Sequence, residues 1–152
     1  MIAALYVILT WVLGDFAYGP IQFRIAECMV VLPFFFPIAT AGLTVGCFLA
    51  NLLSTVGPLD LVLGTLATAL ACGTMWLTRK LTIKNYPLPA ILCPAIWNAL
   101  LVGWELQLYF GGGFWLNALY VAIGELVVLL IPGSILWGAI RARRLEERIF
   151  RR

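Results

Sequence analysis

The sequence predicts an all-α integral membrane protein with six transmembrane helices, and its composition, segment lengths and basic clusters carry this prediction. The 152 residues are 63% hydrophobic and 11% charged, with a mean hydropathy of +1.02. Soluble domains are about half apolar and about a quarter charged, and one of this length still exposes close to a third of its chain surface. Lipid is therefore the expected solvent for most of the chain.

Apolar segments of helical length follow one another along the chain. A bilayer core about 30 Å thick needs roughly 20 helical residues per crossing. We expect one transmembrane domain over 1–152, with helices at about 1–18, 25–36, 38–55, 59–78, 88–110 and 114–140 and a basic tail at 141–152.

Turn residues separate the first helices. The first ends before Gly19–Pro20, and the second stops at Pro37. Because the second helix is short, we expect it to be tilted or to enter the membrane only partway. The third contains Gly42 and Gly46, a spacing that lets helix backbones approach closely.

The later helices carry their own interruptions. Gly57–Pro58 precede the fourth helix, and the glycines at 111–113 separate the fifth from the sixth. Pro94 is a candidate kink in the fifth helix, and Pro132–Gly133 interrupt the far half of the sixth.

Basic residues indicate how the chain is oriented. Arg79, Lys80 and Lys84 share one loop, and the tail carries six arginines. With six crossings both clusters fall on the same side, which the positive-inside rule assigns to the cytoplasm together with both termini. The net charge of +3 is therefore a topology signal in the cell membrane, and no nucleic-acid partner is expected. The tail is either a plain flank or a basic helix lying on anionic lipid.

The chain lacks the residues that most enzymes need. It contains no histidine, and its four cysteines are widely spaced without a C-x-x-C motif. We expect no catalytic residues, no metal site and no cofactor, and we interpret the cysteines as small hydrophobic residues.

A short set of polar residues remains inside or beside the apolar segments. Ionisable groups at membrane depth cost about 2.5–3.5 kcal/mol each on insertion scales, so they usually face a partner or a cavity. The expected orientation places nearly all of them in the outer half, which predicts a cavity that opens outward. The set is Asp15, Gln22, Arg24, Glu27, Asn51, Asp60, Asn98, Glu105, Gln107, Asn117 and Glu125.

Helical spacing groups these residues further. Asn98 and Glu105 are seven apart and share a helix face, while Asn117 and Glu125 are eight apart. Trp97 and Trp104 repeat the interval of seven and flank the first pair. Acids and amides beside aromatic faces suit a flat, nitrogen-rich heterocycle.

Structural explanations compete with this interpretation. Arg24 and Glu27 are equally well explained as an ion pair at a helix start, and Asp60 as a residue that favours the dipole of a helix N-terminus. Asn51 and Asn98 also fit as hydrogen bonds between helices.

Two aromatic residues have a similar alternative. Trp115 and Tyr109 flank the 111–113 turn and fit an aromatic belt at the membrane interface. Glu125 has no such explanation, because no basic residue lies near it in sequence.

Segments along the whole chain together resemble one family. The segments YGPIQFRIAE, LPFFFP, GLTVGCFLANLLS, LDLVLGTLATALA, FWLNAL and IGELVV are similar, in order and spacing, to the QueT family. Its members are substrate-capturing S components of energy-coupling factor (ECF) transporters assigned to queuosine precursors.

The resemblance implies a fold and partners. It implies six helices with cytoplasmic termini, a ligand near the outer face under the loop between the first two helices, and no chemistry by the chain itself. A transmembrane scaffold (T) subunit and two ATP-hydrolysing subunits would be the partners. The ligand would be a 7-deazaguanine, either the cyano precursor, the aminomethyl precursor or queuine.

The resemblance and the polar set together predict a binding site. We expect a tryptophan to stack on the ring, Glu125 or Glu105 to accept from ring N–H and amino groups, and Asn98 or Asn117 to bind the carbonyl. Arg24 and Gln22 would close a lid, and Glu27 or Asp60 would take a cationic group. The expected site residues are Glu125, Glu105, Asn98, Asn117, Arg24, Gln22, Glu27, Asp60, Trp97, Trp104 and Trp115.

One feature of the family is weak here. S components dock on their scaffold through small residues spaced by four on the first helix, whereas Ala3 and Ala4 are followed here by Val7 and Ile8. The docking surface is therefore left open.

Another transporter class remains as an alternative. A small secondary transporter for a nucleobase-like solute could use Glu125 or Glu105 for proton coupling. Such transporters are usually built from inverted repeats, and none is visible in this sequence.

Overall fold

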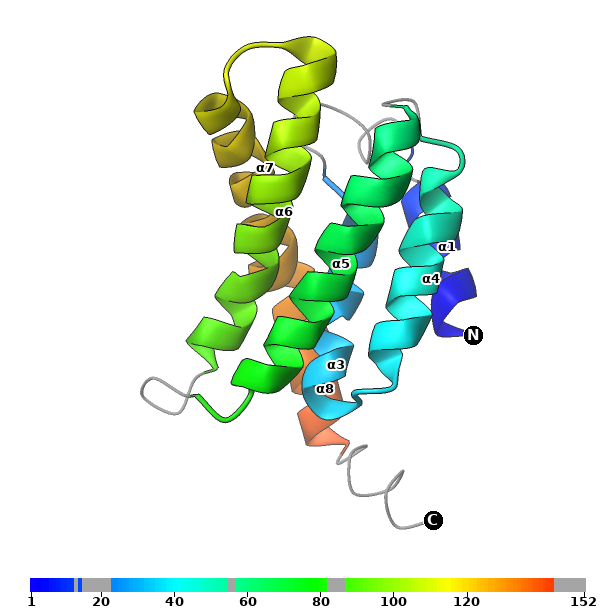
Figure 1. Cartoon of the computed structure of the whole chain (residues 1–152). Coiled ribbons are helices and arrows are strands. Elements are labelled where there is room, and N and C mark those ends of the chain that lie inside the picture. The colour runs from blue at the N-terminus through cyan, green and yellow to red at the C-terminus, as the bar shows by residue number, and fades with distance from the viewer. Residues whose placement is uncertain (13, 15–22, 55–56, 82–86, 144–152) are drawn as a thin grey trace.

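The computed structural model describes residues 1–12, 14, 23–54, 57–81 and 87–143, and every regular element in these ranges is a helix (Figure 1). The elements are α1 (Ile2–Val12), η1 (Ile25–Val31), α3 (Leu32–Phe35), α4 (Ala39–Asn51), α5 (Pro58–Thr78), α6 (Leu88–Phe110), α7 (Phe114–Val128), η2 (Leu129–Gly133) and α8 (Ser134–Ala142).

Helix length and composition identify a membrane protein. Three helices are long and apolar enough to cross a bilayer, and these are Pro58–Thr78, Leu88–Phe110 and Phe114–Ala142. Three apolar helices are shorter: Ile2–Val12, Ile25–Phe35 and Ala39–Asn51. The predicted all-α membrane class is thus confirmed, while the number of crossings and the side of each terminus stay predictions.

The surface of the bundle is apolar, as lipid contact requires. Large hydrophobic side chains point outward from the long helices, for example Val62 at 61%, Leu77 at 70% and Ile135 at 71% exposure. In water such a surface would drive aggregation, whereas in a bilayer it faces lipid tails of the same polarity.

The longer helices pack side by side in chain order. Helix α1 packs against α4, α4 against α5, α5 against α6 and α6 against α7, as Figure 1 shows. The 3-10 helix η1 lies against both α1 and the π-helix η2. This places η1 at the centre of the bundle, between the first helix and the last.

Two glycines allow the closest helix contacts. A Cβ atom at Gly46 of α4 would lie 2.8 Å from the Cβ of Tyr6 and 3.0 Å from the Cα of Ala3. A Cβ at Gly103 of α6 would lie 2.7 Å from the Cα of Ala118. The close approach predicted for the Gly42 and Gly46 spacing is therefore confirmed, and the partner is α1.

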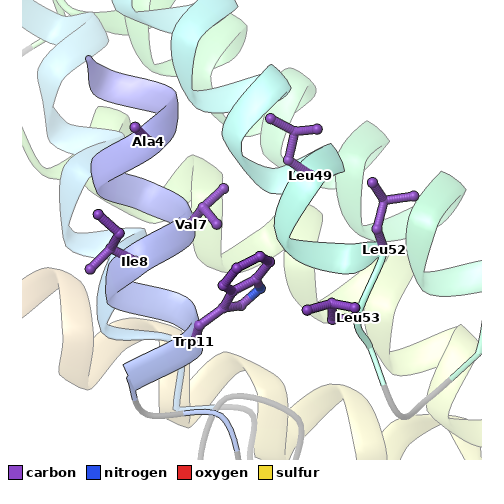
Figure 2. A pocket seen from close by; sticks show the side chains of 7 residues that line it. All are labelled: Ala4, Val7, Ile8, Trp11, Leu49, Leu52 and Leu53. Carbon is purple, nitrogen blue, oxygen red and sulfur yellow. The ribbon is translucent and has the colours of Figure 1, made fainter.

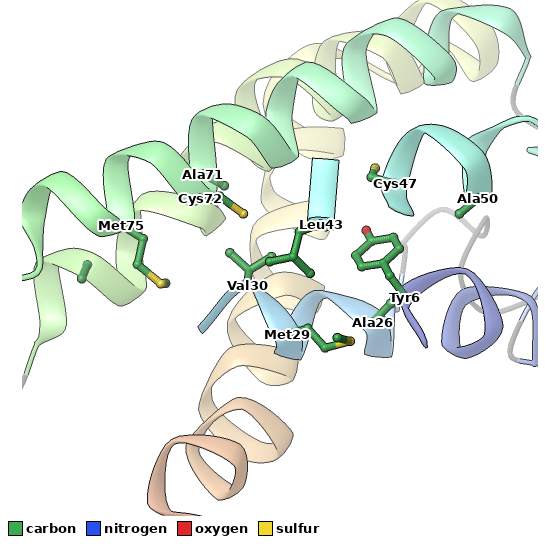
Figure 3. Close-up of a cluster of buried hydrophobic side chains, with 11 residues drawn as sticks. Tyr6, Ala26, Met29, Val30, Leu43, Cys47, Ala50, Ala71, Cys72 and Met75 are labelled. Carbon is green, nitrogen blue, oxygen red and sulfur yellow. The ribbon is translucent and has the colours of Figure 1, made fainter. Parts of the chain in front are cut away.

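The main core lies where α1, η1, α4 and α5 meet. Figure 3 shows Tyr6 pointing from α1 into this cluster, towards α4. The buried members are Tyr6, Ala26, Met29, Val30, Leu43, Cys47, Ala50, Ala71, Cys72, Met75 and Ala90. All four cysteines of the chain are free thiols.

The first expected helix is described only in part. Helix α1 is described to Val12, while its expected end near residue 18 and nearly all of the expected lid sequence lie outside the described residues. The second expected helix differs from the structure. The second is a seven-residue 3-10 helix followed by a four-residue α-helix. Runs of 3-10 helix longer than about four residues are uncommon, and the periodicity of apolar residues does not distinguish the two helix types.

The last helix departs from α-geometry where its proline predicted an interruption. Pro132 lies inside the π-helix η2, between α7 and α8. A proline has no N–H for the ladder, and a π-turn accommodates the missing bond. Pro94, by contrast, lies within the continuous helix α6.

The ends of the bundle differ in composition. One end contains the start of α5 and the turn at Gly111–Gly113, whose three glycines all have positive φ, from +73° to +91°. The other end contains Arg79 after α5 and Arg141 in the last turn of α8. We call these the glycine end and the basic end.

Candidate ligand-binding site

Nine polar or charged side chains are buried in the described part of the bundle. They are Thr10, Arg24, Glu27, Asn51, Asp60, Thr68, Asn98, Glu105 and Glu125. Buried polar groups are costly unless they are hydrogen-bonded, so the partners of each one show whether its role is structural.

Arg24 and Asp60 form an ion pair at the glycine end. Nη2 of Arg24 donates to Oδ1 and Oδ2 of Asp60 at 3.0 and 2.8 Å, and the two side chains are 6% and 0% exposed. Arg24 precedes η1, and Asp60 lies in the first turn of α5, where the helix N-terminus also favours a negative charge. The pair joins segments that are 36 residues apart.

Further donors complete the shell of Asp60. Asn51 donates to the backbone oxygen of Asp60 at 2.8 Å and to its Oδ1 at 3.3 Å, and the hydroxyl of Ser54 donates to Oδ2. Asn51 thereby joins α4 to α5, which confirms the inter-helix hydrogen bond as one of its two expected roles. The carboxylate of Asp60 is well supplied with partners from the chain.

Glu27 is held by hydroxyl groups from two other helices. The Tyr6 hydroxyl donates to Oε1 of Glu27, and the Thr68 hydroxyl lies 3.4 Å from the same oxygen. The other oxygen, Oε2, is buried and has no hydrogen-bond partner within the described ranges. One side of this carboxylate is therefore fixed, and the other is open.

Glu27 and Glu125 line one small cavity between η1, α6 and α7. Its walls are Arg24, Glu27, Asn98, Val102, Val121 and Glu125, and its volume is about 10 Å³, close to the space of a single water position. Asn98 and Glu125 come from the middle of α6 and α7. The cavity therefore lies inside the bundle and not on its surface.

Three walls of this cavity carry an unsatisfied polar atom. Oε2 of Glu27, Nδ2 of Asn98 and Oε1 of Glu125 are buried without a hydrogen-bond partner in the described structure. Leaving such a group unsatisfied costs about 1–3 kcal/mol. Two acceptors and one donor from three elements thus belong to the wall of one cavity, which is an arrangement suited to a polar ligand.

Glu105 lies apart from this cavity. Its side chain is fully buried, and neither carboxylate oxygen has a partner among the described residues. It shares a face of α6 with Asn98 by sequence spacing, but only Asn98 lines the cavity.

The tryptophans and Asn117 lie outside the cavity wall. Trp104 and Trp115 are 49% and 80% exposed on the bundle surface. Trp97 is half-buried, and its Nε1 donates to Thr74 of α5 at 3.2 Å. Asn117 donates to the backbone oxygen of Gly111 at 2.8 Å and so closes the glycine turn.

One expected site residue, Gln22, lies outside the described residues, as does Asp15 of the wider polar set. Two residues of the site were missed by the sequence analysis. Tyr6 and Thr68 orient Glu27 but were not in the expected set. A tyrosine in the middle of an apolar helix was the available signal for Tyr6, whereas Thr68 is one of several threonines on α5 and gives none.

Comparisons with known proteins agree with the architecture. A family model described as QueT transporter matches residues 1–142. The Queuosine precursor transporter QueT of Lactococcus lactis subsp. cremoris (strain MG1363) is 41% identical over 70 residues, which are 45% of this chain and 41% of that protein. The match therefore spans less than half the length of this curated relative. No solved structure matches the chain.

Proposed function

Because the chain belongs to the QueT transporter family, we propose that it is the substrate-capturing S component of an ECF transporter and binds a queuosine precursor. Membership of this family and the three long apolar helices make it a multi-pass protein of the cell membrane. In the proposed role the chain binds its ligand without chemistry, and partner subunits hydrolyse ATP.

The convergence of unsatisfied polar atoms on the cavity carries this proposal. A guanine-like ring offers N–H and amino donors beside a carbonyl acceptor. Glu125 would accept from the donors through Oε1, and the amide of Asn98 would donate to the carbonyl. Val102 and Val121 supply apolar walls for the ring.

The cavity must widen before a heterocycle enters. Pockets for small molecules usually enclose about 300–1,000 Å³, against about 10 Å³ here. Stacking by Trp97, Trp104 or Trp115 would require such a rearrangement, since none of the three lines the cavity.

An apolar groove on the first helix supports the proposed scaffold partner. Figure 2 shows the side chains that line this groove between α1 and α4. The volume of the groove is about 420 Å³. Its wall is formed by Ala4, Val7, Ile8, Trp11, Leu49, Leu52 and Leu53. In the proposed complex the T subunit packs into this groove, with six crossings and both termini of the S component in the cytoplasm.

Ligand titration tests the capture function directly. The protein, purified alone in detergent, is titrated with queuine and with the cyano and aminomethyl precursors while tryptophan fluorescence is followed. We expect saturable binding at nanomolar to low micromolar concentrations. The absence of a response to all three from folded protein would contradict the proposal.

Glu105 favours one alternative, a proton-coupled secondary transporter. A buried carboxylate without partners in the described chain suits reversible protonation. Uptake that persists without the ATPase subunits and collapses with a protonophore would establish the alternative, whereas uptake that requires the ATPases would exclude it.

A further inference from the structure

We infer that the cavity selects a cationic ligand and that Oε2 of Glu27 binds the ligand's ammonium group. This inference rests on the proposed function, and it distinguishes a 7-deazaguanine with an aminomethyl group from neutral compounds with the same ring. It follows from the charged residues in the cavity wall and from the hydrogen-bond partners of each one.

Acidic residues outnumber basic residues at the site. Among the described residues of the cavity wall, Arg24 is the one basic residue beside Glu27 and Glu125. Arg24 binds both carboxylate oxygens of Asp60, which has no other cationic partner in the described ranges. One cation therefore faces the carboxylates of Asp60, Glu27 and Glu125.

No second basic residue lies at the site in the part of the chain that the structure describes. Of its ten Lys and Arg residues, three lie in 79–84 and six in 141–152, which leaves Arg24. Arg79 follows the last turn of α5, and Asp60 lies in the first turn. A helix of 21 residues separates these ends by about 30 Å, so Arg79 does not neutralise the site.

Glu27 is better placed than Glu125 to bind a point charge. The Tyr6 and Thr68 hydroxyls act on Oε1 of Glu27 alone. They orient the carboxylate and stabilise its charge, so that Oε2 is left free at 2% residue exposure. An ammonium group is a compact charge with N–H donors only, which matches this single buried acceptor.

Glu125 suits the other end of the ligand. It lines the cavity together with Asn98, and a carboxylate beside an amide presents both an acceptor and a donor. This mixed pair matches the ring edge, which carries N–H groups and a carbonyl. The two carboxylates therefore have separate roles, and a neutral ligand would leave Oε2 of Glu27 unpaired.

Isothermal titration of the full chain in detergent with matched ligands tests the inference. The ligands are 7-aminomethyl-7-deazaguanine, its size-matched neutral hydroxymethyl analogue and the cyano compound. We expect the aminomethyl compound to bind at least about tenfold more tightly than either neutral compound, because hydrogen bonds to charged groups contribute about 1.5–3 kcal/mol. This comparison uses the unaltered protein and does not depend on a variant folding.

A variant then assigns the charge recognition to one residue. Glu27→Gln keeps an acceptor for the Tyr6 hydroxyl but removes the charge. It should weaken the binding of the aminomethyl compound only, so that its affinity comes within about threefold of the affinity of the neutral compounds. Glu146→Gln, a charge-matched change in the C-terminal tail, should leave the preference unchanged.

Each outcome has a separate meaning. Equal binding of the three compounds by the unaltered protein would overturn the inference and leave the proposed function standing. A preference that survives Glu27→Gln in a variant that elutes and melts as folded protein would overturn the role of Glu27. A failure of all three compounds to bind would contradict the proposed function itself.

Discussion

Gly64 of α5 makes room for the polar network at the glycine end. A Cβ atom at this position would lie 2.6 Å from both Nδ2 of Asn51 and Oδ1 of Asp60. The same position is 3.5 Å from Nη1 of Arg24. The ion pair of Arg24 with Asp60 therefore depends on the absence of a single methyl group.

A pair of glycine substitutions on α5 tests this dependence. Gly64→Ala should destabilise the protein by about 1–3 kcal/mol, the usual range for overpacking. Gly73→Ala on the same helix meets no atom within 4 Å and should stabilise the helix by about 0.5–1 kcal/mol. Thermal unfolding in detergent measures both variants. Equal shifts in the two variants would contradict the steric explanation.

Among the secondary-structure elements, the two irregular helices η1 and η2 contact each other beside the cavity. The 3-10 helix η1 carries Glu27 and packs on the π-helix η2. Helix α1 also packs against η1. A 3-10 helix has poorer hydrogen-bond geometry than an α-helix, and π-turns are frequent at functional sites. One wall of the cavity is therefore formed by the irregular helix η1.

The close contact between α1 and α4 positions Tyr6 against Glu27. Alanine substitutions at the two glycines of this contact test whether helix packing affects ligand binding. Gly46→Ala would bring a Cβ to within 2.8 Å of Tyr6 and 3.0 Å of the Ala3 backbone. At Gly42 the closest atom is the Ile2 side chain, at 3.1 Å. We expect Gly46→Ala to lower the unfolding temperature and the affinity for the aminomethyl ligand more than Gly42→Ala does.

Gly138 provides the control for this series. A Cβ there meets no atom within 4 Å, so Gly138→Ala should leave ligand affinity unchanged. An affinity for Gly46→Ala equal to that of the Gly138 variant would contradict the coupling of the crossing to the site.

The whole molecule has a polar network at one end and basic residues at the other. The ion pair of Arg24 and Asp60 lies at the start of α5, and Arg79 and Arg141 lie at the basic end. Trp76 and Trp137 stack under these two arginines, with ring-centroid distances of 5.1 and 5.7 Å. Cationic and aromatic residues in this combination are typical of the cytoplasmic membrane interface.

A C-terminal reporter tests the orientation. We expect a green fluorescent protein fused after Arg152 to fluoresce and an alkaline phosphatase fused there to be inactive, because positive charge keeps the basic end in the cytoplasm. The reverse pattern would contradict both the orientation and the six crossings. The phosphatase fused in the 111–113 turn, expected to be active, is the matched control.

Local sequence accounts for much of the fold. Lipid requires every backbone group to be bonded within its own helix, so the length and polarity of a segment such as 88–110 are enough to identify α6 (Leu88–Phe110). Small residues spaced by four, as at Gly42 and Gly46, identify a close helix crossing without naming the partner. The type of helix at 25–31 was not predictable, since 3-10 and α-helices share similar apolar spacing.

The sequence by itself determined the membrane class, the long helical segments and the charged residues inside them that have to be accounted for. Tertiary structure decided which of these residues meet. It joined Arg24 to Asp60 across 36 residues, set Tyr6 against Glu27 across 21, and brought Asn98 but not Glu105 to the cavity. Helix periodicity places a side chain on a face, whereas its neighbours depend on how far each helix is rotated and shifted when the whole bundle packs.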